Sequence, residues 1–176
     1  MAIVNVVVGC LCIITITVVF VFAKWMYEIL NDADKPTEVK IKLIDGGKLP
    51  EFKTKGAVCA DCYARLDTNF FIKKGERKLI PLGFACGLSE GYEIQVRPRS
   101  GLSSKGIDVS LGTGDWDYTG EYMACVTNNS DKDFPIHNGD RICQFAIREV
   151  PNIKFKLVDE LEETERGSGG FGHTGI

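Results

Sequence analysis

The chain has 176 residues, with 21 basic and 24 acidic side chains, a formal net charge of -3 and a hydrophobic share of 44%. This near-balance of charge excludes a general nucleic-acid binder, which carries a basic excess. The apolar and aromatic content excludes a disordered chain, and seven cysteines in this length are too few for a disulfide scaffold.

The first 23 residues contain no charged side chain, and the run from Ala2 to Ala23 is almost entirely apolar. About 20 apolar residues in a helix span the ~30 Å core of a bilayer, so residues 1–24 are predicted to be a transmembrane helix that contacts lipid through residues 2–23. A cleaved signal peptide is the alternative, although the run lacks a basic start. Lysines follow the run and none precedes it, which predicts a single-pass membrane protein with its C-terminal domain on the cytoplasmic side.

After this run the pattern changes from helical to alternating. Residues 25–37 are predicted to be a juxtamembrane helix or linker, because Pro36 disfavours helix at the residue before it. Apolar residues then alternate with charged ones from residue 38 to 43, which is typical of a half-buried strand. Further strands are predicted at residues 57–64, 77–86, 92–97, 121–127, 141–148 and 153–158, separated by glycine and asparagine turns. Many short strands without a long amphipathic helix indicate an all-β jelly roll or barrel for residues 38–158.

The C-terminal segment, residues 159–176, differs in composition from the strands. Residues 159–165 carry five acids and are predicted to be a solvated linker, and residues 166–176 contain five glycines. Such a segment cannot bury a core by itself, so one interpretation is a flexible tail. The other is a lid, because backbone N–H groups freed by glycine, together with Arg166, can converge on phosphate oxygens.

Three short motifs contain the residues best suited to chemistry. Arg99-Ser100-Gly101 follows an alternating strand, residues 112–120 place two aspartates and a tyrosine in a glycine-rich hairpin, and residues 139–144 read Gly-Asp-Arg-Ile-Cys-Gln. Each motif alone is also what an ordinary polar turn or a surface ion pair looks like, since Asp and Gly are the usual turn formers.

Taken in order with the segment around Asp61 and the glycine-rich end, these motifs resemble the five motifs of the trimeric dUTP diphosphatases (dUTPases). The resemblance covers roughly residues 39–176 and implies a dUTPase-like jelly-roll or barrel fold. Two departures stand out. Cys59 and Cys62 occupy positions where the first motif usually has Gly and Leu, and Gly114 stands where the third motif usually has an aliphatic residue.

The resemblance implies hydrolysis of dUTP to dUMP and pyrophosphate, by attack of water on the α-phosphorus with Mg²⁺ bridging phosphate oxygens. This reaction limits dUTP and supplies dUMP for thymidylate synthesis. Asp115 is then the catalytic base, and Asp61 contacts the metal ion through a water molecule. The resemblance also implies a homotrimer with shared active sites, so further copies of the chain are the expected partners.

The same resemblance assigns the remaining site residues. The phosphates are expected to be bound by Arg99, Ser100, Gly101, Gln144, Arg166 and Thr174. The uracil and deoxyribose are expected to contact Leu111, Gly112, Thr113, Gly114, Tyr118, Met123, Phe171 and Gly172. Tyr118 is expected to pack against the deoxyribose, leaving no room for a 2′-hydroxyl, and Phe171 to stack over the uracil.

Two other functions stay open at this point. One is the related dCTP deaminase, which shares the fold, and the other is a membrane-tethered module that binds dUTP or a protein partner without turnover. The intact hairpin with Asp115 and Tyr118 argues for the diphosphatase. Cys59 and Cys62 do not favour a zinc site, because positions three apart on one strand face opposite sides; free thiols are predicted instead.

Overall fold

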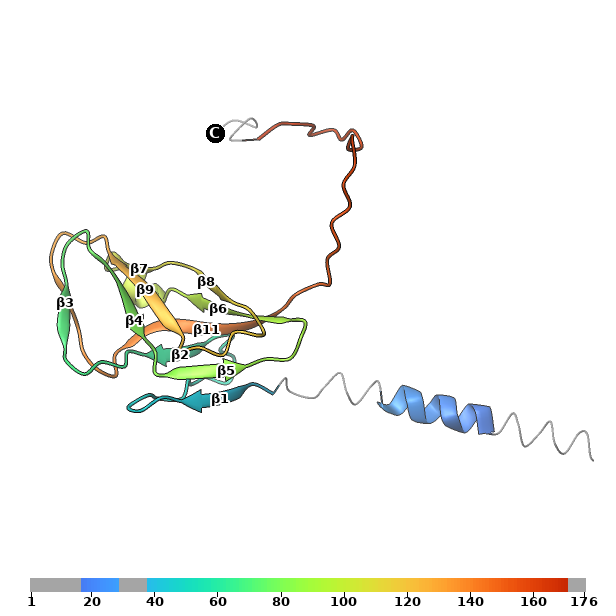
Figure 1. Ribbon diagram of the computed structural model, residues 1–176, viewed down its shortest axis with the longest axis horizontal. Coiled ribbons are helices and arrows are strands. Elements are labelled where there is room, and N and C mark those ends of the chain that lie inside the picture. Colours follow the sequence, from blue (N-terminus) through green and yellow to red (C-terminus); the bar gives the residue numbers. More distant parts are fainter. Residues whose placement is uncertain (1–16, 29–37, 171–176) are drawn as a thin grey trace, which may run out of the picture.

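The computed structural model describes residues 17–28 and 38–170 (Figure 1). Between residues 38 and 170 the described chain has a single four-residue helix, α2 (Ser100–Ser103), and eleven strands that pair only in antiparallel fashion. The strands are β1 (Lys40–Leu43), β2 (Ala60–Tyr63), β3 (Phe70–Ile72), β4 (Arg77–Pro81), β5 (Phe84–Gly87), β6 (Tyr92–Arg97), β7 (Ile107–Val109), β8 (Gly112–Gly114), β9 (Met123–Asn128), β10 (Phe134–Ile136) and β11 (Arg141–Glu149). The prediction of an all-β domain is confirmed.

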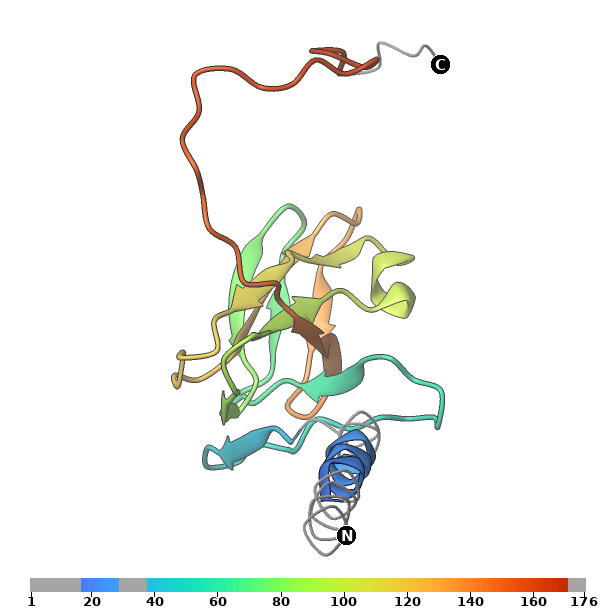
Figure 2. The same cartoon turned by 90° about the vertical axis from the view of Figure 1, so that its right-hand side faces the viewer.

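Two sheets and two short ladders form the body of the domain (Figures 1 and 2). One sheet has the order β2-β11-β6-β8 and the other β4-β9-β7, while β1 pairs with β5 and β10 with β3. One hydrophobic core contains buried side chains from both sheets, including Ile94 and Val96 of β6 and Ile80 of β4. In β6 these residues alternate with more exposed polar ones, because successive side chains of a strand point to opposite faces.

Aromatic rings extend this core toward the hairpin that follows β8. Phe84 is fully buried, stacks on Tyr122 with ring centroids 5.8 Å apart, and meets Phe145 edge-on at 5.5 Å. Aromatic pairs in these offset and edge-to-face arrangements are stabilising beyond the area they bury. The segment around Tyr122 is therefore fixed to the core by packing.

The predicted strand at residues 77–86 is two strands, because the chain turns at Leu82 and Gly83. Gly83 has φ +74°, a left-handed conformation that favours glycine, and a Cβ there would lie 2.5 Å from the Cα of Gly47. The predicted strand at residues 153–158 is not present. Phe155 and Leu157 are 94% and 98% exposed, since the alternating segment has no neighbouring strand to pair with in this chain.

The N-terminal prediction needs correction. The structure describes a helix at residues 17–28, and none of the helices in the described residues is long and apolar enough to cross a membrane. This finding contradicts the predicted single-pass topology with a cytoplasmic C-terminal domain. Residues 1–16 and most of the predicted juxtamembrane segment lie outside the described residues.

Candidate active site

A cavity of about 310 Å³ opens beside the hairpin that follows β8. It is lined by Val96, Gly112, Thr113, Gly114, Asp115, Tyr118, Glu121, Tyr122 and Met123. Six of these residues were predicted from the sequence to contact or act on a nucleotide. Leu111 was also predicted but does not line the cavity; its side chain is 63% exposed.

Local hydrogen bonds set the shape of this hairpin. The backbone N–H of Tyr118 donates to the carbonyl of Asp115 at 3.1 Å, which closes the turn. The Tyr118 hydroxyl donates to the backbone carbonyl of Glu121 at 3.0 Å, and its ring meets Tyr122 edge-on, with centroids 5.3 Å apart. The Tyr118 ring is thus held against the cavity wall, while the Asp115 carboxylate stays exposed beside it. A carboxylate on the wall of a cavity is placed to accept a proton from a water molecule bound there.

The floor of the cavity explains why glycine stands at position 114. Gly114 is buried, and a Cβ there would lie 2.6 Å from the Tyr122 ring and closer still to its hydroxyl. The phenol of Tyr122 therefore fills the space that a side chain at position 114 would take. Its hydroxyl is buried beside the Cys86 thiol without a hydrogen bond of normal geometry, and burial raises the pKa of Tyr122.

This packing predicts a compensating pair of substitutions. We expect Gly114→Val and Tyr122→Val each to destabilise the domain by about 2–3 kcal/mol, through overpacking in the first and a cavity in the second. The double variant replaces a missing and a large side chain by two of intermediate size, so the total volume stays close to that of the wild type, and it is expected to lose less stability than either single variant. A double-mutant cycle in urea measures this coupling, and simple addition of the two losses would contradict it.

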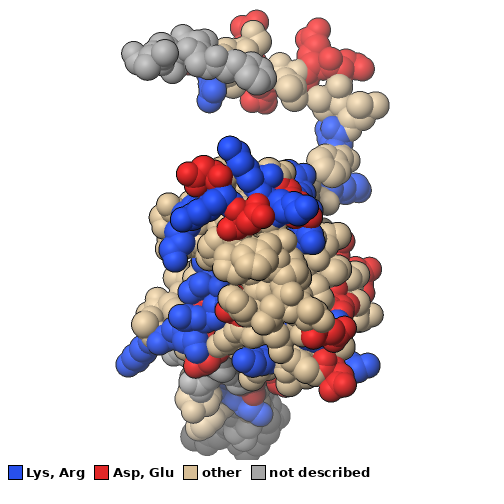
Figure 3. Space-filling model, turned by 90° about the vertical axis from the view of Figure 1, so that its left-hand side faces the viewer, with Lys and Arg blue, Asp and Glu red and all other residues tan. Residues whose placement is uncertain are grey.

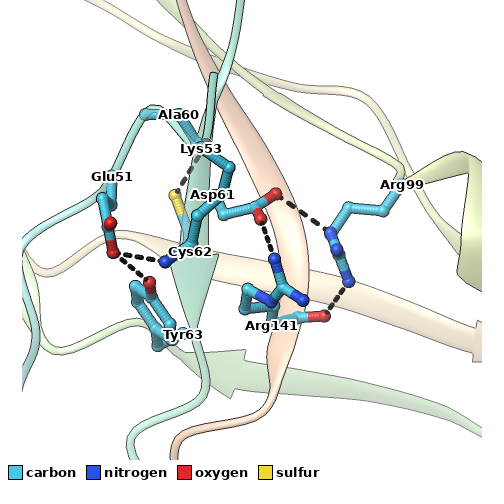
Figure 4. A network of polar contacts seen from close by, with 8 residues as sticks. All are labelled: Glu51, Lys53, Ala60, Asp61, Cys62, Tyr63, Arg99 and Arg141. Carbon is cyan, nitrogen blue, oxygen red and sulfur yellow. Dashed lines mark hydrogen bonds and ion pairs between the residues drawn. The ribbon is translucent and has the colours of Figure 1, made fainter. Parts of the chain in front are cut away.

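A second group of charged residues surrounds Asp61 on β2 (Figure 4). Arg99 donates from Nε to Oδ1 of Asp61 at 3.0 Å, and Arg141 donates from Nη1 to Oδ2 at 2.9 Å. Arg99 also donates to the backbone carbonyl of Arg141 at 2.7 Å. Asp61 is only 5% exposed, and a buried carboxylate is tolerated where charged partners satisfy both oxygens. Two guanidinium groups on one carboxylate leave a net positive charge at this place.

The residues next to Arg99 and Asp61 suit an anion as well. Ser100 and Gly101 form the first turn of α2, where backbone N–H groups have no partner within the helix. A Cβ added to Gly101 would meet nothing within 4 Å, so the space above it is open. Gln144 on β11 lies opposite Asp61 on one side and Arg97 on the other. Arginine and amide donors of this kind make charge-assisted bonds to phosphate.

The donor set fits a magnesium ion carried by phosphate better than a metal held by protein alone. The described residues hold no group of three or more His, Cys, Asp or Glu side chains that could bind a metal ion. Mg²⁺ keeps several waters and is usually bound by one or two carboxylates plus phosphate oxygens. Each oxygen of Asp61 accepts one arginine hydrogen bond and retains a lone pair for a metal-bound water.

The cavity and the Asp61 group lie far apart in one chain. Asp61 is on β2 at one edge of the four-stranded sheet, and Asp115 follows β8 at the opposite edge. Three strand spacings separate the edges, about 14 Å across the sheet. The two sites are also offset along the strands. Asp61 is level with Arg97 of β6, through Gln144, whereas Gly114 is level with Ile94, and three residues along a strand are about 10 Å. A single chain therefore does not bring the predicted base and the predicted phosphate-binding residues together.

The described part of the tail lies apart from both groups. Residues 150–170 contain neither strand nor helix and leave the domain after β11, with their acids visible above its body in Figure 3. Arg166 is exposed, and its Nε donates to the carbonyl of Gly169 at 2.8 Å. The predicted tail contacts Phe171, Gly172 and Thr174 lie outside the described residues.

Sequence reasoning missed Arg141, although it lies inside one of the motifs. The neighbouring Asp140 suggested a surface pair, but Asp140 accepts instead from the backbone N–H of His137 at 2.8 Å. A register bulge in β11 lets Arg141 reach Asp61. The five cysteines in the described residues are free, as predicted.

Comparisons with known proteins agree on one family. Residues 45–175 match the family described as dUTPase. The deoxyuridine 5'-triphosphate nucleotidohydrolase of Finegoldia magna is 45% identical over 142 residues, covering 78% of this chain and 99% of the relative. The enzyme of that name from Treponema denticola is 47% identical over 142 residues, covering 79% and 99%. The family match begins after the helix at residues 17–28, which gives the predicted membrane segment no support.

Solved structures agree on the fold. The dUTPase of Staphylococcus bacteriophage 80alpha with dUPNHPP has a TM-score of 0.74 at 23% identity, covering 80% of this chain and 100% of that chain. A mutant of the dUTPase from phage phi11 of S. aureus, studied for the coordination of a structural Mg(II) ion, has a TM-score of 0.66 at 21% identity, covering 72% and 99%.

Proposed function

The chain belongs to the dUTPase family and hydrolyses dUTP to dUMP and pyrophosphate, and we propose that Asp115 is the base that deprotonates the attacking water. The observation that carries this role is the position of Asp115, an exposed carboxylate on the wall of the cavity beside Tyr118. A general base of this kind contributes about 10²- to 10⁴-fold to a rate.

Selection of the nucleotide follows from the shape of the same cavity. We propose that the backbone of residues 112–114 reads the uracil edge and that Met123 packs beside it. An amino group in place of the uracil oxygen would meet a donor there, and an unpaired buried polar group costs about 1–3 kcal/mol. The Tyr118 ring, fixed by Glu121 and Tyr122, leaves no room for a 2′-hydroxyl.

The residues around Asp61 are proposed to bind the triphosphate. Arg99 and Arg141 supply positive charge, the backbone of Ser100 and Gly101 supplies donors, and Gln144 adds an amide. Asp61 aligns the two arginines and would touch Mg²⁺ through a water. When bound to the phosphates, the ion neutralises charge that develops in the transition state.

We propose that the active enzyme is a homotrimer in which one chain supplies Asp115 and another supplies the Asp61 group. Two observations support this. The two groups are too far apart in one chain to hold one nucleotide, and the exposed segment that contains Phe155 and Leu157 needs an apolar partner. A neighbouring copy meets both needs, and the tail is proposed to close over the site of such a neighbour.

Mixing two inactive variants tests the shared site. We expect Asp115→Asn and Arg99→Ala each to be inactive alone, because every site in either trimer lacks one group. Unfolding and refolding the two together should restore a fraction of the wild-type rate, since some sites in mixed trimers combine two intact groups. Mixing without refolding is the control. A refolded mixture that stays inactive while its mass is that of a trimer would contradict shared sites.

Product analysis separates this activity from its alternatives. With Mg²⁺, dUTP should give dUMP and pyrophosphate, UTP should react far more slowly, and dCTP should release no ammonia. Ammonia from dCTP would identify a deaminase, and tight binding of dUTP without pyrophosphate would identify a binding module.

A further inference from the structure

A bidentate ion pair holds one wall of the cavity from outside. Arg65, two residues after β2, donates from Nε to Oε1 of Glu121 at 3.0 Å and from Nη2 to Oε2 at 3.1 Å. The backbone N–H of Gly83 donates to Oε1 of Glu121 at 3.0 Å. Both oxygens of this carboxylate are therefore occupied. Paired bonds of this geometry fix direction as well as distance.

The pair is partly shielded from solvent and tied to the core. The side chains of Arg65 and Glu121 are 24% and 25% exposed. The backbone N–H of Arg65 donates to Pro81 at 2.9 Å, and its aliphatic stem packs on Gly83, where a Cβ would lie 3.0 Å from it. Arg65 thus has little freedom to move away from Glu121.

Glu121 transmits this constraint to Tyr118. The backbone carbonyl of Glu121 accepts the Tyr118 hydroxyl at 3.0 Å, so the residue that Arg65 fixes is the residue that holds the ring. Glu121 itself lines the cavity, whereas Arg65 does not. An unpaired Glu121 would also place a negative charge on the wall of a pocket proposed to take a triphosphate.

We propose that Arg65 is a positioning residue for sugar selection, acting through Glu121 on the Tyr118 ring. It needs no contact with the nucleotide. Its guanidinium keeps the Glu121 carbonyl where the Tyr118 hydroxyl can reach it and neutralises the Glu121 carboxylate. This inference rests on the proposed role of Tyr118 and names a residue beyond those that surround the nucleotide.

The test compares rates with dUTP and UTP for Arg65→Gln, Arg65→Lys and the double variant Arg65→Gln/Glu121→Gln. We expect Arg65→Gln to lower kcat/KM for dUTP and to reduce the preference for dUTP over UTP roughly ten- to hundredfold, since a displaced ring no longer fills the space beside C2′. Arg65→Lys keeps the positive charge but cannot form the bidentate pair of a guanidinium. Compared with Arg65→Gln, it should therefore recover more of the affinity for dUTP than of the preference for dUTP over UTP. The double variant Arg65→Gln/Glu121→Gln, with a neutral amide pair, should recover part of both.

Arg77→Gln is the matched control, because Arg77 on β4 is exposed and its side chain donates only to Thr127 Oγ1, at 3.0 Å, among the hydrogen bonds of the described chain. It should leave the preference unchanged. If Arg65→Gln lowers both rates in the same proportion, or changes neither, the inference is wrong even though the wild type hydrolyses dUTP. If the wild type releases no pyrophosphate, the proposed function fails instead. Should Arg65→Gln not fold, Arg65→Lys decides the question by the same ratio.

Discussion

Asp115→Asn is expected to lower kcat for dUTP by about 10³-fold while leaving the affinity for the nucleotide within a few-fold of wild type. The amide keeps the shape of the side chain, so the hairpin and its Tyr118–Asp115 turn should persist. What the amide lacks is a lone pair basic enough to take a proton from water. Stopped pyrophosphate assays give the rate, and calorimetry with the unreactive analogue dUPNHPP gives the affinity.

Asp117→Asn provides the matched control for this experiment. Asp117 lies in the same exposed turn, two residues further on, but does not line the cavity. Its neutralisation removes the same charge from the hairpin and should change kcat by less than about threefold, because field effects between exposed charges are weak. Equal losses in the two variants would assign the effect to charge rather than to a base, and a fully active Asp115→Asn variant would remove Asp115 from the mechanism.

The sequence predicted the fold class well because local pattern determines much of it. β6 alternates apolar and polar residues without interruption, and its predicted range is the observed one. The segment at residues 153–158 alternates equally well, yet Phe155 and Leu157 are exposed. Alternation indicates that a segment can form a strand, but a strand also requires a neighbour, which in this case the chain itself does not supply.

Short strands without alternation were missed because a neighbouring strand, and not their own sequence, makes them strands. β8, with the sequence Gly-Thr-Gly, has almost no strand propensity, and it exists because β6 offers its edge in register from Ile94 to Val96. The N-terminal run failed differently. Its composition matches that of a spanning helix, but the part of the chain that the structure describes contains no helix long and apolar enough to cross a membrane.

The part of the site formed by one short motif could be predicted from the sequence, because the residue types and their order are visible there. Gly112, Thr113, Gly114, Asp115, Tyr118 and Met123 all line the cavity. The positions of Arg65 and Arg141 were not predictable, because their partners Glu121 and Asp61 lie 56 and 80 residues away. Pairings over such distances depend on strand order, which no local pattern contains. The same holds for the exchange of volume between Gly114 and Tyr122.

Ending the chain at Glu165 is expected to lower turnover of dUTP by at least about 10²-fold without unfolding the domain. Of the removed residues, the described ones, 166–170, add no strand or helix to the domain, so their loss should leave the melting temperature unchanged. Arg166 bonds only a neighbouring carbonyl in the described structure, which leaves most of its five N–H donors for an anion. The truncated chain lacks these donors and every residue predicted to close over the nucleotide.

The truncation should remove two kinds of contact: those of Arg166 with the outer phosphates and the predicted stacking of Phe171 on the uracil. Two affinity measurements separate these effects. Affinity for dUPNHPP should fall more than affinity for dUMP in the truncated chain, because only the analogue has the phosphates that Arg166 would bind. Full-length Phe171→Ala should lower the affinity for both ligands by the same factor, since it removes only the predicted stacking on uracil.

Refolding the truncated chain together with Asp115→Asn should restore some turnover if the tail closes over a neighbouring copy. A truncated chain with wild-type kcat would show that the tail has no part in turnover, and catalysis would then have to rest on the Asp115 cavity and the Asp61 group alone.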